Sequence, residues 1–489
     1  MYKRQYKFYA GNRWHDPSSE KYFESEDPSI GKVWAKVPDC NEKDINLAVS
    51  SAKHAYYDGP YGKMHPAERG RTLNRIGDII AKNAERIGQI ETKDNGKLPK
   101  NITPSLTSWQ TESFYYYAGM CDKYEGRLIP SEVTNMHNYL KWEQFGVVAL
   151  ILPWNSPIGT LIWKLAPAIA AGNTVVIKPS ERASCSTLEL MKILEEADLP
   201  EGLINVVTGF GPTTGAPLIE HQDVRMISFT GGTKGGSAAS LSASKNVKPI
   251  IMELGGKSPQ IIFKDADLTL SVNGVVSGIF PVSGHSCISG SRILVHKDIK
   301  DKFTHNLLEV VKKAKVGHPN DVATQIGPIA NKEQYEFILS KIEAAEKRGL
   351  KLLIDGRKEQ KSEGYYIGPT IFDNVPNEDD LAQNEVFGPV ASIQSWDNED
   401  EVIKIANDTI YGLAAGIWTN DTNKAIRLAD KIEAGTVYIN NYFNASTQSP
   451  VGGFKQSGYG RENGWEGMQS YMQTKSTWLA TNPSQPNPF

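Results

Sequence analysis

Short apolar runs alternate with helix-like segments along most of the chain from residue 145 onward. Runs rich in β-branched residues predict strands at 146–152, 174–177, 204–207 and 226–230, with helices between them at 184–197 and 234–243. These strands lack polar alternation and are joined by helices, which is typical of a parallel sheet covered on both faces. The pattern therefore predicts an α/β fold.

A second series of strands and helices follows residue 258. Its predicted strands lie at 260–263, 292–295, 389–393, 413–418 and 436–439. Ahead of the first series, residues 66–90 carry apolar side chains at the spacing of one helix face, and Pro66 suits a first helical turn. A chain of 489 residues fits two or three domains, so each series is expected to form its own domain.

Residues 123–142 differ from both series. Tyrosine, leucine, isoleucine and valine are scattered among polar residues there, which predicts a β-hairpin. Extended strand edges of this kind commonly pair across a subunit interface. We expect the hairpin to stand apart from the two domains.

Composition narrows the class of protein. Lysine and arginine number 53 against 56 aspartate and glutamate, and no basic run is dense enough to neutralise nucleic-acid phosphates. The four cysteines stand alone, without the spacing of a zinc site or a disulfide framework. The N-terminus lacks a signal-peptide core, and the apolar stretches are short or interrupted by charge, as at Lys164. We expect a cytoplasmic protein that binds no nucleic acid, membrane or metal.

One glycine-rich turn is placed to bind a nucleotide. Residues 229–236 run from a predicted strand through Gly231 and Gly232 into a helix N-terminus, whose free N–H groups attract phosphate. The glycines at 209–215 lack dinucleotide spacing, and residues 254–258 lack the first glycine of a triphosphate loop. The turn at 229–236 is therefore the preferred nucleotide site.

Three residues carry the functional groups of acyl chemistry through a thioester. Cys287 lies in a loop of small residues, whereas Glu253 and Asn155 lie at the ends of two different predicted strands. Such chemistry needs a thiol nucleophile, a carboxylate base and an amide donor. Each residue is weak evidence alone, since a lone cysteine is by default a buried, inert thiol.

Seven motifs, in this order, resemble the aldehyde dehydrogenase superfamily over essentially the whole chain. They are PWN at 153–155, KPSE at 178–181, FTG at 229–231, ELGGKSP at 253–259, Cys287 with GSR at 290–292, EVFGP at 385–389 and PVGGFKQSG at 450–458. Two positions depart from the family pattern. His285 stands where Gln or Glu is usual two residues before the nucleophile, and Gly232 replaces a usual serine. Neither change removes a catalytic group.

The resemblance implies the architecture of that family. It predicts a Rossmann-like parallel-sheet cofactor domain, here residues 1–122 and 143–255, and a second α/β catalytic domain at 256–456. A small β oligomerisation arm would consist of residues 123–142 and the C-terminal segment 471–489. The chain is therefore expected to form a homodimer or homotetramer.

The resemblance also assigns catalytic roles. The Cys287 thiolate would attack the aldehyde carbonyl, and the Asn155 amide and the Cys287 backbone N–H would hold the oxyanion. Hydride would pass to nicotinamide, and Glu253 would then take a proton from the water that hydrolyses the thioester. The expected product is a carboxylic acid.

NAD is the cofactor that the resemblance implies, with NADP less favoured. By the family match, Lys178 and Glu181 contact the adenosine ribose, Glu385 contacts the nicotinamide ribose, and Phe387 lies beside the nicotinamide. The remaining cofactor-binding residues are Gly231, Gly232, Trp154 and Leu254. Glu181 would repel the extra phosphate of NADP, because like charges about 4 Å apart repel by roughly 4 kcal/mol at an effective dielectric near 20.

The substrate is expected to be a small aldehyde with polar groups. Loop 440–450, which the family uses to grip the distal end of its substrate, has no arginine and many polar residues. The residues at 278–280 and 287–290 resemble those of bacterial family members that act on intermediates of aromatic and N-heterocycle breakdown. One candidate substrate is (Z)-2-((N-methylformamido)methylene)-5-hydroxybutyrolactone. Trp163 and Tyr116 either line the substrate funnel or pack in the core.

Two alternative functions are left open. A coenzyme-A-acylating dehydrogenase uses the same cysteine, but that branch generally lacks the base at Glu253. A catalytically retired relative would act as a structural or binding protein. The presence of Cys287, Glu253 and Asn155 together argues against this second alternative, because a structural or binding protein would not need them.

Overall fold

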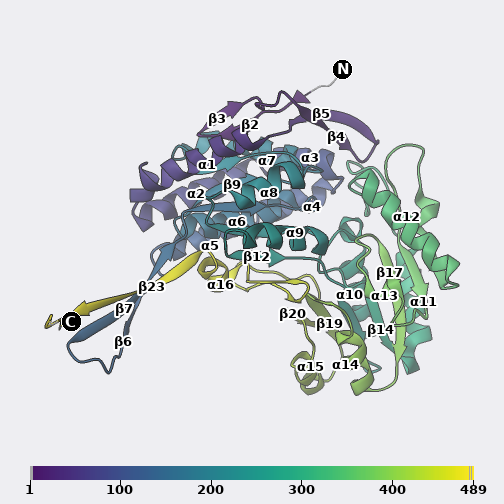
Figure 1. Ribbon diagram of the computed structural model, residues 1–489. Coiled ribbons are helices and arrows are strands. Elements are labelled where there is room, and N and C mark those ends of the chain that lie inside the picture. The colour runs from purple at the N-terminus through teal and green to yellow at the C-terminus, as the bar shows by residue number, and fades with distance from the viewer. Residues whose placement is uncertain (1–3, 484, 486) are drawn as a thin grey trace.

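The computed structural model describes residues 4–483, 485 and 487–489. Residues 1–3, 484 and 486, at the ends of the predicted cofactor domain and C-terminal segment, lie outside the described residues. Two large sheets, each covered by helices, form the body, and a smaller sheet projects from it (Figure 1). The predicted α/β fold class is confirmed.

The first sheet has the strand order β22-β12-β11-β8-β9-β10-β2-β3 among the described residues. Its strands are β2 (Phe8–Ala10), β3 (Arg13–His15), β8 (Val147–Ile151), β9 (Thr174–Lys178), β10 (Ile204–Val206), β11 (Met226–Thr230), β12 (Ile250–Glu253) and β22 (Gly458–Tyr459). The five strands from β12 to β10 pair in parallel. The chain adds β9 and β10 on one side of β8 and then β11 and β12 on the other. A topological switch point therefore lies between β8 and β11.

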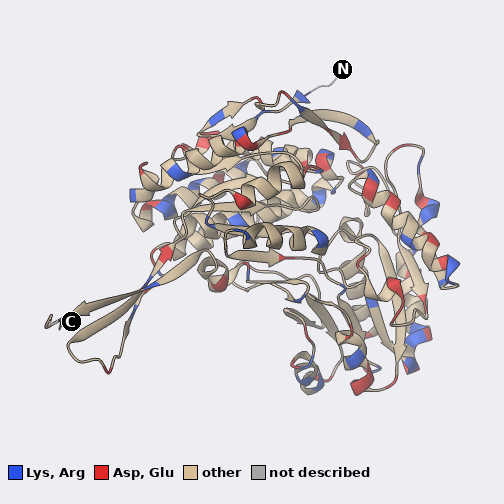
Figure 2. Cartoon of the chain, in the orientation of Figure 1, with Lys and Arg blue, Asp and Glu red and all other residues tan. Residues whose placement is uncertain are grey.

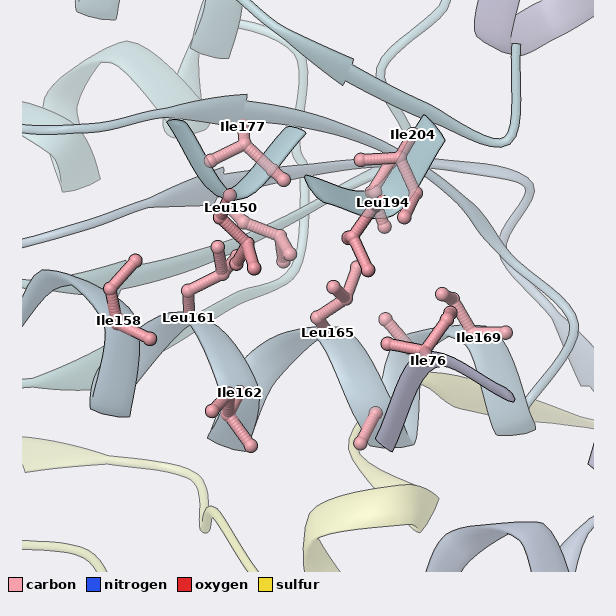
Figure 3. Packing of buried hydrophobic residues seen from close by; sticks show 14 of the residues in the cluster. Ile76, Leu150, Ile158, Leu161, Ile162, Leu165, Ile169, Ile177, Leu194 and Ile204 are labelled. Carbon is pink, nitrogen blue, oxygen red and sulfur yellow. The ribbon is translucent and has the colours of Figure 1, made fainter. Parts of the chain in front are cut away.

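Helices cover both faces of this sheet. They are α1 (Glu42–Tyr57), α2 (Pro66–Lys82), α3 (Ala84–Asn95), α4 (Pro99–Leu106), α5 (Glu112–Met120), α6 (Pro157–Ala170), α7 (Cys185–Leu194), α8 (Ala216–Glu220) and α9 (Thr233–Ser244). Leu150 of β8 belongs to one apolar cluster and its neighbour Ala149 to the other, because successive strand residues point to opposite faces. In Figure 3, Leu150 lies close to Leu161 of α6.

The single helix predicted at 66–90 is wrong, because the structure has two helices there. α2 ends at Lys82 and α3 begins at Ala84, and Asn83 between them has a non-helical backbone conformation. The Asn83 side chain donates to the backbone oxygen of Ile79 over 2.9 Å. Asparagine side chains compete in this way with the helix backbone, and apolar spacing alone does not reveal it.

The second sheet has the order β15-β16-β17-β14-β13-β19-β20 and is parallel except for β15. Its strands are β13 (Pro259–Ile262), β14 (Arg292–His296), β15 (Lys351–Ile354), β16 (Thr370–Asp373), β17 (Val390–Trp396), β19 (Ala414–Trp418) and β20 (Thr436–Ile439). Its helices are α10 (Leu268–Ile279), α11 (Lys300–Val311), α12 (Lys332–Lys347), α13 (Asp380–Gln383), α14 (Glu399–Asn407) and α15 (Thr422–Ala429). All nine strands predicted in the two series are confirmed, with β17 extending three residues further than predicted.

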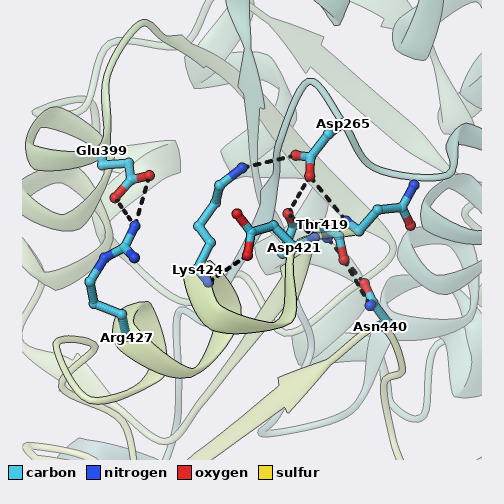
Figure 4. Close-up of polar contacts among 8 residues, drawn as sticks. Asp265, Glu399, Thr419, Asp421, Lys424, Arg427 and Asn440 are labelled. Atoms are coloured by element: carbon cyan, nitrogen blue, oxygen red, sulfur yellow. Dashed lines mark hydrogen bonds and ion pairs between the residues drawn. The ribbon is translucent and has the colours of Figure 1, made fainter.

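Polar side chains fix the strand ends next to α15 (Figure 4). Asp265, after β13, accepts hydrogen bonds from the Thr419 hydroxyl over 2.8 Å and from Lys424 over 3.2 Å. Asn440, after β20, bonds to both backbone groups of Thr419. These bonds set the start of the loop at 440–450.

The projecting sheet consists of β6 (Arg127–Ile129), β7 (Met136–Gln144) and β23 (Met472–Ala480), paired antiparallel in the order β23-β7-β6. Figure 1 shows it extending away from both large sheets. The predicted hairpin is confirmed, and the C-terminal strand lies along it. Leu128 and Trp478 on this arm are 70% and 55% exposed. Large exposed apolar residues of this kind are typical of a contact surface.

Several short elements complete the fold. A small sheet joins β1 (Arg4–Gln5), β5 (Lys32–Pro38) and β4 (Tyr22–Asp27), and β18 (Tyr411–Gly412) pairs with β21 (Phe454–Lys455). The helix α16 (Gly464–Gln469) precedes β23. Acidic and basic residues are interspersed over both halves of the molecule (Figure 2). Among the described residues, no helix has the length and apolarity to span a bilayer, and no cluster of His, Cys, Asp and Glu side chains suits a metal ion.

Candidate active site

Four predicted site residues lie at the carboxyl ends of strands in the first sheet. β8 leads to Asn155, β9 ends at Lys178, β11 leads to Gly231, and β12 ends at Glu253. Parallel strands bring these ends to one edge, and α/β sheets bind ligands at that edge near a switch point. The topology thus places motifs that are distant in the sequence along one edge of the sheet.

The loop with Cys287 reaches this edge from the second sheet, between α10 and β14. The side-chain amide of Asn155 donates to the backbone oxygen of His285 over 3.0 Å. A side chain at Gly256 would come within 2.5 Å of the Cys287 backbone oxygen, so this glycine permits close packing against the end of β12. The loop that carries Cys287 and the Asn155 side chain therefore meet where the two sheets contact each other.

The environment of the Cys287 thiol opposes its ionisation. Burial raises its pKa to about 12, and the charges of Glu253 and Glu385 add to the rise. The backbone N–H groups of Ile288 and Cys287 act in the opposite direction. The thiol is therefore protonated at neutral pH, and a base would have to remove its proton before Cys287 could act as a nucleophile. The same N–H groups are suited to stabilise negative charge beside the sulfur.

Glu253 is a buried carboxyl whose Oε1 has no hydrogen-bond partner among the described residues. Burial raises its pKa well above the usual range and Glu462 raises it further, whereas Lys164 and Arg461 lower it. A carboxyl with a raised pKa close to a thiol fits a general base, because it binds a proton more readily than an exposed one.

A buried ion pair that the sequence analysis missed lies next to Glu253. Lys164 on α6 pairs with Glu462 and donates to the Ser228 hydroxyl of β11 over 2.8 Å. Both charged side chains are almost fully buried. The lysine interrupts an apolar helix, and this signal could have marked it as functional. Glu462 gives no such signal, because it stands 298 positions away.

His285 lies against two aromatic rings. Its ring centre is 5.0 Å from that of Trp154, edge to face, and 5.9 Å from that of Phe387, stacked. Burial lowers the His285 pKa to about 3, so the imidazole is neutral at pH 7. The residue that departs from the family pattern therefore adds no positive charge beside Cys287.

Lys178 and Glu181 face each other beyond β9. The Lys178 ammonium lies 3.5 Å from the Glu181 carboxylate and 3.0 Å from the backbone oxygen of Pro179. Lys178 is buried, which lowers its pKa, and Glu181 is partly exposed. A donor beside an acceptor matches ribose hydroxyls, which both donate and accept hydrogen bonds.

The N-terminus of α9 has the character of a phosphate site. The helix begins directly after Gly232, and no side chain of the described residues caps it. A side chain at Gly231 would meet the Phe229 ring at 2.9 Å, whereas Gly232 has open space. The buried hydroxyl of Thr230 also lacks a partner among the described residues. Uncapped N–H groups and an unpartnered hydroxyl fit a pyrophosphate.

The residues predicted to hold the nicotinamide half lie beside the Cys287 loop. The backbone N–H of Gly256 donates to Glu385 over 3.0 Å, and burial raises the Glu385 pKa to about 7. The Phe387 ring centre is 5.1 Å from that of Trp154, edge to face. Leu254 follows β12 and packs closely against Gly236 of α9. These positions lie between the glycine turn and the Cys287 loop.

Part of the polar loop at 440–450 is hydrogen-bonded to other segments of the fold. Asn440 bonds to Thr419, the Tyr442 hydroxyl donates to the backbone oxygen of Ile288 over 2.8 Å, and Thr447 shares a 3.0 Å hydrogen bond with Ser113. The polarity of this loop therefore supports a polar substrate less strongly than the sequence indicates.

Aromatic rings lie on α5, on α6 and in the turn before α5. Trp163 has its ring 5.8 Å from that of Trp109, which the sequence analysis did not select. Tyr116 packs edge to face on Tyr117 at 5.0 Å. All but the buried Tyr117 are half-buried, so their surfaces are open in part. Trp109 carries no motif, and only the fold places it beside Trp163.

Comparison with known proteins identifies the family. The sequence model of the aldehyde dehydrogenase family matches residues 14–477. The (Z)-2-((N-methylformamido)methylene)-5-hydroxybutyrolactone dehydrogenase of Acinetobacter baylyi is 38% identical over 477 residues, covering 97% of each chain. Human aldehyde dehydrogenase 1A1 is 40% identical over 477 residues, covering 97% of this chain and 95% of its own.

Solved structures of other proteins indicate the same family. The NAD+ complex of aldehyde dehydrogenase from Bacillus cereus superposes with a TM-score of 0.95 at 36% identity, covering 97% of this chain and 96% of that chain. A betaine aldehyde dehydrogenase from Staphylococcus aureus in complex with NAD+ gives 0.96 at 35% identity, covering 99% and 96%. The chain belongs to the aldehyde dehydrogenase family. The predicted family and enzyme class are confirmed.

Proposed function

We propose that this chain oxidises a small aldehyde to a carboxylic acid with NAD as the hydride acceptor. The observation that carries the proposal is the meeting of the Cys287 loop, the Asn155 amide and the buried Glu253 at the ends of β8 and β12. The glycine turn before α9 and the Lys178–Glu181 pair support a dinucleotide along the same edge. Relatives of this chain are solved as NAD+ complexes.

The first step is attack by Cys287 on the aldehyde carbon. The sulfur forms a bond to carbon, the thiol proton leaves to a base, and the carbonyl oxygen becomes an oxyanion. The Asn155 amide and the Cys287 backbone N–H donate to that oxygen. Loss of one such donor typically costs about 3 to 4 kcal/mol in comparable sites.

Bound NAD would supply the acceptor for the hydride that leaves the thiohemiacetal carbon. The residues that orient it are proposed to be Lys178, Glu181, Glu385, Phe387 and Trp154, with Gly231, Gly232 and Leu254 lining the turn and the end of β12. Glu253 then removes a proton from water, which attacks the thioester carbon and displaces the Cys287 thiolate. The Lys164–Glu462 pair lies beside Glu253 and tunes its basicity, because Glu462 raises the Glu253 pKa and Lys164 lowers it.

The proposed substrate is a polar aldehyde or cyclic hemiacetal, such as a hydroxylactone from N-heterocycle breakdown. The Acinetobacter relative supports this choice by its name. A panel of semialdehydes, hydroxylactones, aromatic aldehydes and aliphatic aldehydes tests it by NADH absorbance. A hydroxylactone or polar semialdehyde should give the highest kcat/KM. Preference for long alkyl aldehydes would contradict the proposal.

The same assay separates the alternative functions. A coenzyme-A-acylating enzyme would need coenzyme A for steady-state NADH formation, whereas the proposed enzyme needs only water. The presence of Glu253 beside the nucleophile favours hydrolysis. A catalytically retired relative would form no NADH with any aldehyde.

Cofactor choice gives a prediction at Glu181. We expect NAD to be preferred over NADP by roughly tenfold to a few hundredfold in kcat/KM, because the Glu181 carboxylate would repel the 2′-phosphate. Replacing Glu181 by serine should narrow this ratio, chiefly by improving the NADP value. The ratio is measured from initial rates with each cofactor. Equal use of both cofactors by the unmodified enzyme would show that Glu181 does not face the ribose.

Assembly gives a second prediction. We propose that residues 123–142 and 471–489 join subunits, while residues 1–122 with 143–255 and residues 256–456 form the cofactor and catalytic domains. The exposed Leu128 and Trp478 on the arm support this assignment. Light scattering at micromolar concentration should give a dimer or tetramer, and a monomer would contradict it.

The four cysteines are free thiols, which supports a cytoplasmic location.

A further inference from the structure

The start of α6 lacks a cap of its own, although it carries the oxyanion donor. Asn155 lies two residues before Pro157, where α6 begins. The N-cap residue Ser156 makes no capping hydrogen bond to the helix within the described part of the chain. Helix N-termini leave several N–H groups without partners, and uncapped ends fray. Another part of the molecule must therefore hold this segment in place.

The end of α3 and the turn after it supply that support. The Asn95 side-chain amide donates to the backbone oxygen of Trp154 over 3.1 Å and contacts that of Asn155 at 3.5 Å. The Lys97 ammonium donates to the Ser156 hydroxyl over 3.3 Å. Side chains two positions apart in one turn thus bind both neighbours of the oxyanion donor and its own backbone.

A buried carboxylate anchors this turn. The Glu91 side chain is 1% exposed, and its Oε1 lies 3.5 Å from the ammonium of Lys97, which is 12% exposed. Burial raises the Glu91 pKa, while Lys97, the Asn95 amide and the backbone N–H of Ile158 lower it. Ile158 is the second residue of α6. Glu91 therefore contacts both Lys97 and the first turn of α6.

Packing alone does not fix Asn155. A small hollow lies beside it, lined by residues that include Asn95, Lys97, Asn155 and His285. A side chain with empty space on one side is free to shift unless polar contacts restrain it. The hydrogen bonds from Asn95 and Lys97 are the restraints on this side.

We propose that Glu91, Asn95 and Lys97 are positioning residues for the oxyanion donor Asn155, with Lys97 acting through Ser156. This inference rests on the proposed function, because it assigns these residues to acylation. Catalytic donors must stand in the correct place before charge develops, and a displacement of about 1 Å can cost roughly a hundredfold in rate. None of the three side chains takes part in bond making, so their effect is confined to the geometry of Asn155.

The test compares two reactions of Cys287 in a set of variants. Aldehyde acylation forms an oxyanion and is followed as the first-turnover NADH burst, whereas alkylation by iodoacetamide forms none. We expect Lys97→Met and Ser156→Ala each to slow acylation by about tenfold to a hundredfold and to leave alkylation within about twofold of wild type. Adding Ser156→Ala to Lys97→Met should have little further effect, because the two residues act as one unit.

Control variants sharpen the result. Lys97→Arg keeps the charge and donors and should restore most of the acylation rate. Lys100→Met removes a nearby exposed lysine, whose ammonium donates to the Val322 backbone oxygen, and should match wild type. If Lys97→Met fails to fold, Ser156→Ala decides the question alone.

Three outcomes are distinguishable. Normal acylation in Ser156→Ala, or an equal loss of acylation and alkylation, would overturn the inference while leaving the proposed function intact. Absence of NADH from wild-type enzyme with every aldehyde would instead refute the proposed function. Slow acylation with normal alkylation in the variants supports both the positioning inference and the proposed function.

Discussion

Replacing Cys287 by serine is expected to lower aldehyde-dependent NADH formation by more than about a thousandfold. Thiolates are far better nucleophiles than alcohols at neutral pH, and an oxygen ester would hydrolyse less readily than a thioester. NAD affinity should stay within about twofold of wild type, because the residues proposed to bind the adenosine half follow strands of the other sheet. NADH absorbance and a cofactor fluorescence titration measure the two effects.

A second cysteine gives the matched control. The buried Cys121 thiol donates to the backbone oxygen of Tyr117, a bond that serine can also make, so Cys121→Ser should retain turnover. Activity near wild type in Cys287→Ser would remove the central claim of the proposed mechanism. Loss of NAD binding in that variant would show that the loop also shapes the cofactor site.

The sequence is sufficient to predict the strand-end motifs, for a physical reason. Asn155, Lys178, Gly231 and Glu253 each stand at the end of an apolar run, and runs without polar alternation indicate a buried parallel sheet. In such a sheet the carboxyl ends share one edge. The order of the motifs then predicts the family, and the structure places Asn155 against the loop that carries Cys287.

Other parts of the site depend on contacts that no local pattern contains. The partner of Lys164 is Glu462, which lies between β22 and α16 and forms an isolated β-bridge with Val451. The polar residues of loop 440–450 look available in the sequence, yet Asn440 and Thr447 bond to distant residues. In the sequence Lys97 looks like an ordinary surface lysine, and only the fold brings it beside Ser156.

Glu253→Gln is expected to separate the two halves of the reaction. The thioester should still form, giving an NADH burst of about one equivalent per active site. Steady-state turnover should fall by about a hundredfold or more, because glutamine cannot take a proton from the attacking water. Rapid mixing with excess aldehyde and NAD measures both phases. A burst that disappears together with turnover would show that Glu253 acts in acylation instead.

The pH dependence of turnover supplies an independent check on Glu253. Burial and Glu462 hold its pKa well above the usual range, so the basic carboxylate becomes more populated as pH rises through that raised pKa. Deacylation-limited turnover should therefore rise by about tenfold per pH unit below the raised pKa and level off above it. Glu253→Gln should lose this rise, whereas Glu343→Gln, on the exposed side of α12, should keep it.

Glu462→Gln should shift the rise to lower pH, because it removes the nearby negative charge that raises the Glu253 pKa. An unchanged profile in Glu253→Gln would assign the titration to another group, and the base would then have to be sought elsewhere in the site.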